Sequence, residues 1–196
     1  MINQHNRDQK ALKGIMYMIF SMTIVPLMDG IAKFLSAKYP IIEIVWARYF
    51  FHLLFLFPIV LYQYKHLALV SKQPFLQIIR GGLLLSSTIF FFAAISEVPL
   101  VDALALIFIS PILVTILSPK LLGEKVGFRR WLAVSVGFIG ALIIIKPGLN
   151  ELSSGTMYAL FAGLIYSLYI ITTRRLSGSA PPLITLTYTA LLGAIV

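Results

Sequence analysis

The sequence predicts an all-α polytopic membrane protein, and three observations support that fold class. Hydrophobic residues make up 59% of the 196 positions and charged residues only 12%, whereas soluble domains carry about 25% charged residues. Most of the apolar runs are long enough to cross a bilayer, which takes about 20 helical residues. Most Lys and Arg residues lie between these runs, where membrane proteins carry their topology signal.

Seven apolar runs define the expected transmembrane helices. A basic tail over residues 1–13 comes first, and the runs then cover residues 14–36, 41–63, 74–95, 99–122, 130–146, 155–173 and 181–196. Strands of an outer-membrane barrel would be shorter and would alternate in polarity. The stretch FLQIIRGGLLLSSTIFFFAAI, residues 75–95, does not alternate. We therefore expect helices in every run.

The basic residues between the runs predict the orientation of the chain. Eleven of them fall in the tail and in the second, fourth and sixth connections, whereas Lys33, Lys38 and Lys146 fall on the other side. Because cytoplasmic loops carry the excess of Lys and Arg, the N-terminus is expected in the cytoplasm, with the helices in a bacterial inner membrane. The net charge of +9 then reflects topology, and we expect no nucleic-acid partner.

Residues 14–36 and 155–177 form an internal repeat at a fixed offset of 141 positions. Eight aligned positions are identical, including Gly14 with Gly155 and Tyr17 with Tyr158. Five predicted spans separate the two copies, so the second copy must begin at the opposite face of the membrane. An inverted-topology repeat of this kind is typical of secondary transporters. The repeat also argues against a cleaved signal peptide over the first run, which lacks a clear cleavage site.

The repeat predicts how the chain divides into domains. The tail over residues 1–13 is followed by a first five-helix repeat over residues 14–148 and by the start of an inverted second repeat over residues 149–196. A complete second repeat would bring the total to about ten helices. We therefore expect either a fragment of a longer protein or a chain that pairs with a second copy in a homodimer.

Five ionisable residues inside the predicted spans are the candidate substrate-binding or coupling residues: Asp29, Arg48, His52, Arg80 and Asp102. A charge at the centre of a membrane helix costs about 2.5–3.5 kcal/mol on insertion scales, so such residues usually face a protein interior or a wet cavity. Arg48 and His52 are four residues apart and therefore share one helix face. Asp29, Arg48 and Asp102 are expected in the outer half of the bilayer, where opposite charges can pair.

Three of these candidates leave alternatives open. Asp102 follows Pro99, so it can act as the acidic residue that favours the first turn of a helix. His52 can be a core histidine that bonds to a neighbouring carbonyl group. Asp29 is expected to face the protein interior as a ligand, as a proton site or as the partner of Arg48.

The remaining charges inside the runs lie near helix ends. Arg80 is near the inner end of its span, where it can extend to the lipid headgroups or contribute to a site. Lys33 and Glu43 are near the outer ends of their spans and can reach the interface in the same way.

Prolines and small residues predict how the helices bend and pack. Pro26, Pro58 and Pro111 fall inside runs, where each removes a backbone hydrogen bond. The stretch around Pro111, ISPIL, is the best candidate for a bend that lines a cavity. Small residues recur every fourth position in two runs, and we expect both stripes to pack closely against other helices: Ala133, Gly137 and Ala141, and Ala159, Gly163 and Ser167.

The sequence contains no recognised catalytic or metal-binding motif. It has no cysteine, and HExxH, GxSxG and P-loop patterns do not occur. His5, His52 and His66 lack the spacing of metal ligands. An intramembrane hydrolase built on Asp29 and Asp102 is conceivable, but no flanking pattern favours it. We therefore expect neither an enzyme nor a bound cofactor or metal ion.

Residues 98–148 resemble the first repeat of EamA-type transporters in the drug/metabolite transporter superfamily. The resemblance is carried by LLGEKVGFRRWLAVSVGFIGALIIIKPG and by the ordered stretches VWARYFFHLL, IIRGGLLLSSTIFFFAAI and YALFAGLIYSLYIITTRRL. It implies ten helices in two inverted five-helix repeats around a central cavity. The present chain stops in the seventh of these helices.

The resemblance implies a secondary transporter of small organic metabolites that works by alternating access across the cytoplasmic membrane. Its expected partners are a small-molecule substrate and membrane lipid, and its transport is expected to be proton-coupled or an exchange. The sequence as a whole also resembles the branch of the family that takes up S-adenosylmethionine, which favours that compound or an amino-acid-like solute as the substrate. A channel and a membrane scaffold protein are the alternatives outside this class.

Overall fold

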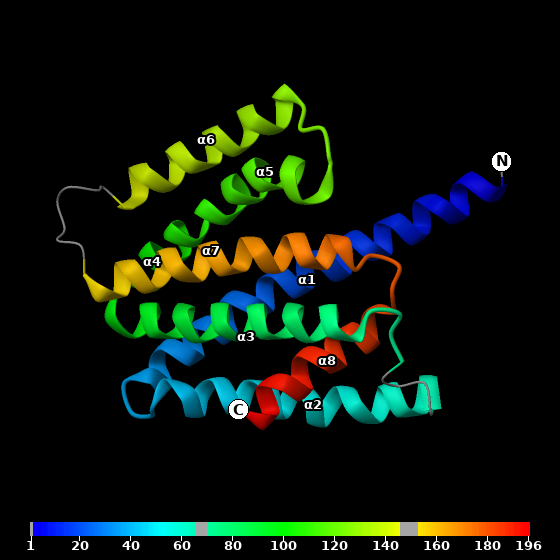
Figure 1. Ribbon diagram of the computed structural model, residues 1–196, viewed down its shortest axis with the longest axis horizontal. Coiled ribbons are helices and arrows are strands. Elements are labelled where there is room, and N and C mark those ends of the chain that lie inside the picture. Colours follow the sequence, from blue (N-terminus) through cyan, green and yellow to red (C-terminus); the bar gives the residue numbers. More distant parts are fainter. Residues whose placement is uncertain (1, 66–69, 146–152) are drawn as a thin grey trace.

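The computed structural model describes residues 2–65, 70–145 and 153–196, which contain eight helices and no strand (Figure 1). The helices are α1 (Ile2–Ser36), α2 (Ile41–Tyr64), α3 (Pro74–Glu97), α4 (Leu100–Ile107), α5 (Ile109–Leu122), α6 (Phe128–Ile145), α7 (Ser154–Arg175) and α8 (Pro182–Ile195). Each of the seven predicted runs coincides with a helix once α4 and α5 are counted as one broken span. The predicted all-α polytopic fold is confirmed.

Five helical stretches within the described residues are long and apolar enough to cross a bilayer, and α8 is a shorter apolar helix. The five are Gly14–Ser36, Ile41–Tyr64, Pro74–Glu97, Leu100–Leu122 and Ser154–Arg175. The basic tail is not a separate segment, because α1 already begins at Ile2. The chain is thus a multi-pass membrane protein.

Successive spans alternate in direction along the long axis of the molecule, as Figure 1 shows. Helix α7 runs opposite to α1, and α8 runs opposite to α2. The two aligned pairs of helices therefore have the opposite orientations that an inverted repeat requires. The division into domains at residues 13 and 148 stays a prediction.

Helix α3 is the centre of the bundle, and α1 lies at its edge. Half of the apolar window of α3 is buried, against 11% of the window of α1. Helix α3 packs most extensively against α7, and it also contacts α1, α2, α4 and α8. Its buried side chains Phe91, Phe92 and Ile95 belong to the main hydrophobic core. The side chains that α3 directs towards these neighbouring helices are therefore shielded from lipid.

Small residues let α7 approach its neighbours closely. Ala159, Gly163 and Ser167 are all buried, which confirms the predicted packing of this stripe. A Cβ atom at Gly163 would lie 2.7 Å from Ile109 Cγ2, and one at Gly155 would lie 2.8 Å from Val98 Cγ1. The absence of a side chain at these two positions therefore fixes the distance of α7 from α3 and from the α4–α5 span.

The stripe predicted on α6 does not pack in the same way. Ala133 and Gly137 are exposed, and no atom lies within 4 Å of a Cβ built at Gly137. The side chain of Ala141 lies outside the described residues. The packing prediction was wrong for the described part of this stripe, because α6 contacts only α4 and α5 and leaves its other faces open.

The fourth span is broken at Phe108, three residues before Pro111. Proline has no N–H to donate to the carbonyl of Ile107, and its ring clashes with that carbonyl group, so the helical ladder is interrupted one turn earlier. The break lies against α7, where Gly163 leaves room for the backbone of Ile107. The predicted bend is confirmed, and α7 covers it.

Gly123 and Glu124 form the turn that follows α5. Gly123 has φ +69°, which is the left-handed conformation that glycine adopts most readily at a helix end. The Glu124 carboxylate then forms ion pairs with Arg174 at 3.2 Å and with Arg130 at 3.8 Å. These exposed pairs join the α5–α6 turn to the end of α7.

Candidate functional site

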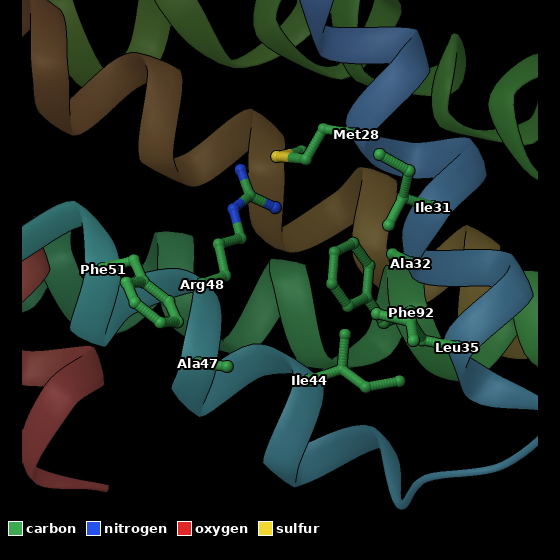
Figure 2. A pocket seen from close by; sticks show the side chains of 9 residues that line it. All are labelled: Met28, Ile31, Ala32, Leu35, Ile44, Ala47, Arg48, Phe51 and Phe92. Atoms are coloured by element: carbon green, nitrogen blue, oxygen red, sulfur yellow. The ribbon is translucent and has the colours of Figure 1, made fainter.

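A cavity of about 270 Å³ lies where α1, α2 and α3 meet. Its lining is almost entirely apolar, and Arg48 supplies its charge. Figure 2 shows the Arg48 side chain extending from α2 towards Met28 of α1, with the Phe92 ring of α3 beside the cavity. The remaining lining residues are Ile31, Ala32, Leu35, Ile44, Ala47 and Phe51.

The guanidinium group of Arg48 lies close to two aromatic rings. Its Cζ atom is 5.6 Å from the centroid of the Phe92 ring and 5.9 Å from that of Tyr49. Tyr49 is buried, and its hydroxyl forms a 3.0 Å hydrogen bond with Thr88 Oγ1. Ring faces attract a cation and so offset part of the cost of removing it from water. The cation is therefore held at the cavity without a carboxylate from the described residues bonded to it.

Asp29 and His52 lie near Arg48, as the sequence predicted. Asp29 is only 6% exposed, and both residues are within Coulombic reach of the guanidinium group. The carboxylate of Asp29 forms no direct ion pair with Arg48, since the ion pairs of the described residues all involve Glu124. Asp29 and His52 are thus within electrostatic reach of Arg48, although neither is among the residues that line the cavity.

Asp102 does not join these three residues. It lies partly exposed in the first turn of α4, and within the described chain its carboxylate has no ion-pair partner. Its backbone N–H donates to the carbonyl of Pro99 at 3.0 Å. An acidic side chain at this position is stabilised by the positive end of the helix dipole. The geometry therefore agrees with the alternative in which Asp102 stabilises the first turn of α4.

Lys33 closes the end of α3 and does not extend to the lipid headgroups. Its Nζ atom donates to the carbonyl oxygens of Ile95 at 2.7 Å and Val98 at 2.8 Å. The last carbonyls of a helix have no partner within the helix, and a lysine is a favourable partner for them. Lys33 therefore ties the C-terminal end of α1 to the corner between α3 and α4.

A Lys33→Met variant is expected to be less stable by about 1–3 kcal/mol, because two backbone carbonyls lose their partner in a partly buried site. Thermal unfolding of the purified protein in detergent measures the effect. Lys38→Met is the matched control, because Lys38 is exposed and its amine only contacts the Phe34 ring. Equal melting temperatures for the two variants would contradict the capping role of Lys33.

Arg80 lies in a second, separate polar cluster between α3, α7 and α8. It is 4% exposed, so it does not extend to the headgroups. Nε donates to Thr173 Oγ1 at 2.9 Å, Nη1 donates to Thr189 Oγ1 at 2.9 Å, and Nη2 donates to the Tyr169 hydroxyl at 2.8 Å. A longer bond of 3.4 Å joins Nη1 to the Thr185 carbonyl. The Tyr169 ring also faces the guanidinium group, with its centroid 4.7 Å from Cζ.

Sequence reasoning missed the hydroxyl groups that hold Arg80. The threonines in these apolar runs had no predicted role, although their spacing carried a signal. Tyr169 and Thr173 are four residues apart, as are Thr185 and Thr189, so each pair presents two hydroxyls on one helix face. Two such faces can together accept the hydrogen bonds of a buried arginine on a neighbouring helix.

The arrangement described so far defines a multi-pass helical membrane protein with a charged, aromatic cavity among its spans. The sequence profile of the EamA-like transporter family matches residues 12–146, and the chain belongs to that family. No solved structure matches the chain.

Curated relatives of the chain include transporters of different solutes. It is 27% identical to the S-adenosylmethionine uptake transporter of Rickettsia prowazekii (strain Madrid E), over 94% of this chain and 63% of that protein. It is also 27% identical to the riboflavin transporter of Rhizobium johnstonii, over 88% of this chain and 58% of the relative. The pseudopaline exporter CntI of Pseudomonas aeruginosa is 28% identical over 80% of this chain and 53% of its own length. The chain thus spans less than two thirds of these relatives.

Proposed function

We propose that the protein containing this chain is a secondary transporter that moves a small organic metabolite across the cytoplasmic membrane by alternating access. The observation that carries the proposal is the cavity between α1, α2 and α3, in which Arg48 lies over two aromatic rings. A guanidinium group recognises carboxylate or phosphate groups with two parallel hydrogen bonds, and the apolar wall suits the organic part of a solute.

The opposite charges of Arg48 and Asp29 favour a zwitterionic solute. Asp29 is buried and is not among the residues that line the cavity, so the carboxylate of the solute would bond to Arg48 while its amino group is attracted electrostatically towards Asp29. Among the relatives' solutes, this arrangement fits S-adenosylmethionine or an amino-acid-like compound, and we propose this class as the first to test. Riboflavin is the second, because another relative carries that name and the cavity offers aromatic faces.

Proton coupling and exchange are both compatible with these charged groups. Asp29 and His52 are the candidate proton carriers, since buried carboxyl and imidazole groups can titrate near neutral pH. We further propose a bacterial inner-membrane location with the N-terminus in the cytoplasm, on the basis of the basic residues in the connections. Pairing of two copies of the chain stays a prediction.

The test is uptake and counterflow by the full-length protein in proteoliposomes, with S-adenosylmethionine and riboflavin as the labelled probes. A transporter is expected to show saturable uptake of one probe and accelerated exchange against unlabelled solute. Imposing and then collapsing a pH gradient separates proton coupling from exchange. Flux that rises linearly with concentration would indicate a channel.

A membrane scaffold is the second function that the test distinguishes. A scaffold has no need for the charges of Asp29 and Arg48. If no probe is transported and a double Asp29→Leu, Arg48→Leu variant keeps the stability and cellular effect of the wild type, the transport proposal fails.

A further inference from the structure

A second cavity, of about 480 Å³, lies at the opposite end of α3 from the α3–α4 corner. Helix α3 contributes Arg80, the end of α7 contributes Thr173, and the beginning of α8 contributes Thr185. The turn between α7 and α8 completes the wall with Ser177, Gly178 and Ala180. This cavity shares no lining residue with the Arg48 cavity.

The charge of Arg80 is not neutralised within the described residues. Its guanidinium group has five N–H donors, and the four bonds it makes all go to neutral hydroxyl or carbonyl oxygens. No carboxylate pairs with it in the described part of the chain. A buried charge without an opposite charge is costly, and one N–H of Nη2 remains available. This N–H and the positive charge can therefore serve a negative ligand in the cavity.

Two further polar atoms beside this cavity have no hydrogen-bond partner among the described residues. They are the hydroxyl of Ser179, which is 9% exposed, and Gln77 Oε1, whose side chain is fully buried. Ser179 lies between Gly178 and Ala180, which both line the cavity, and Gln77 donates to Thr185 Oγ1 at 3.1 Å. Neither Ser179 nor Gln77 lines the cavity itself, and Gln77 Oε1 can only accept a hydrogen bond. Because buried polar groups nearly always have partners, these two atoms point to water molecules beside the cavity and not to the anion itself.

The electrostatic surroundings favour a negative ligand. Helix α8 begins at Pro182, beside the cavity, and no side chain caps its first turn. The unpaired N–H groups at the start of a helix carry a partial positive charge and attract anions.

We propose that the Arg80 cavity is a phosphate-binding site, distinct from the substrate cavity at Arg48. The ligand is either the phosphate of an anionic lipid headgroup or a soluble phosphate group. It accepts hydrogen bonds from the free N–H of Arg80 and from the Ser177 hydroxyl, and it neutralises the guanidinium charge. A phosphate held there connects α3 to the α7–α8 corner.

The test measures binding by the purified chain and does not depend on transport. Thermal unfolding in detergent is followed with inorganic phosphate or with chloride at equal ionic strength. In a parallel arm, the chain is reconstituted in phosphatidylcholine alone or with phosphatidylglycerol, and native mass spectrometry records the retained phosphatidylglycerol. The wild type is expected to be stabilised by phosphate, by phosphatidylglycerol or by both.

Two variants assign the effect to this cavity. Arg80→Gln removes the charge, and Ala180→Phe fills the cavity while the guanidinium group and its hydrogen bonds remain. Both variants are expected to bind the probe that stabilises the wild type, inorganic phosphate or phosphatidylglycerol, at least about tenfold more weakly. A loss of this size corresponds to one charge-assisted hydrogen bond. If Arg80→Gln does not fold, Ala180→Phe decides alone. Arg175→Gln, which removes an exposed charge at the same end of α7, is the matched control and is expected to bind like the wild type.

The possible outcomes distinguish a soluble phosphate from a lipid headgroup, and both of these from failure of the proposal. Stabilisation by inorganic phosphate that both cavity variants lose supports a soluble ligand. An effect confined to phosphatidylglycerol, and lost in the same variants, supports a lipid headgroup. The proposal is overturned if neither phosphate affects the wild type, or if the effect survives in Ala180→Phe.

Discussion

An Arg48→Gln variant is expected to insert normally and to transport its substrate about a hundredfold more slowly than the wild type. Removing one partner of a buried charged hydrogen-bond pair costs about 2–5 kcal/mol, and 2.7 kcal/mol corresponds to about a hundredfold. The loss is specific, because Arg48 is the charged residue in the lining of its cavity and no carboxylate in the part of the chain that the structure describes is bonded to it.

The kinetic pattern distinguishes a binding role from a structural one. If Arg48 binds the substrate, Arg48→Lys is expected to recover part of the uptake at raised substrate concentration, because lysine keeps the charge but loses the planar pair of donors. If Arg48 only packs against Tyr49 and Phe92, glutamine and lysine would lower stability and leave the apparent KM unchanged. Uptake into proteoliposomes over a range of substrate concentrations measures both parameters.

Arg175→Gln is the matched control for this experiment. Arg175 is exposed at the end of α7, so the same substitution removes one positive charge without touching either cavity. Uptake at the wild-type rate is expected for this control. If the Arg48→Gln protein inserts normally and keeps the wild-type KM and rate, Arg48 is not part of the substrate site.

The positions of the helices were predictable from the sequence because hydrophobicity and length determine them. Every predicted run coincides with a helix, and the break in the fourth span falls one turn before Pro111 because the missing N–H acts on the preceding turn. The opposite directions of α1 and α7 also follow from counting spans. These features depend on hydrophobicity, helix length and the position of proline, which can all be read from the sequence.

The candidate site was predictable only in part, because contacts between helices depend on how each helix is rotated about its axis. Depth in the membrane brought Asp29 and Arg48 to one region, and the four-residue spacing put His52 on the same helix face as Arg48. Both Asp29 and His52 lie within Coulombic reach of the guanidinium group. Depth alone also suggested that Lys33 reaches the interface, whereas it bonds to the carbonyls of Ile95 and Val98.

Arg80 shows the same limit of sequence reasoning. Its position near a helix end suggested the headgroups, but the hydroxyl-bearing faces of α7 and α8 are turned towards it and bury it. Which face of a helix meets its neighbour is set by where the helices can approach most closely. Glycines at the contact points decide that approach, and Gly193 is the clearest case near the substrate cavity.

A Gly193→Ala variant is expected to be destabilised by about 1–3 kcal/mol or more, the usual cost of overfilling a packed core. A Cβ at Gly193 would lie 2.2 Å from Tyr49 Cγ, 2.5 Å from Cδ2 and 2.7 Å from Cβ. The Tyr49 ring is buried and its hydroxyl is bonded to Thr88, so it cannot move aside without losing that bond. Thermal unfolding in detergent measures the loss.

Gly140→Ala is the control for this substitution, because a Cβ at Gly140 meets no atom within 4 Å and alanine favours a helix. Tyr49→Ala removes the two nearest of the three close atoms. The double Gly193→Ala, Tyr49→Ala variant is therefore expected to be less destabilised than the sum of the single variants, by more than about 0.5 kcal/mol. Additive effects, or a Gly193→Ala protein as stable as Gly140→Ala, would contradict the close contact of α8 with α2.

The same substitution also connects packing to the proposed transport. Tyr49 follows Arg48 in α2 and presents its ring to the guanidinium group, so displacing the ring moves one of the two faces that hold the cation. Gly193→Ala is therefore expected to raise the apparent KM for uptake even at temperatures where the protein remains folded. An unchanged KM in a measurably destabilised Gly193→Ala protein would show that Arg48 is positioned by Phe92 alone.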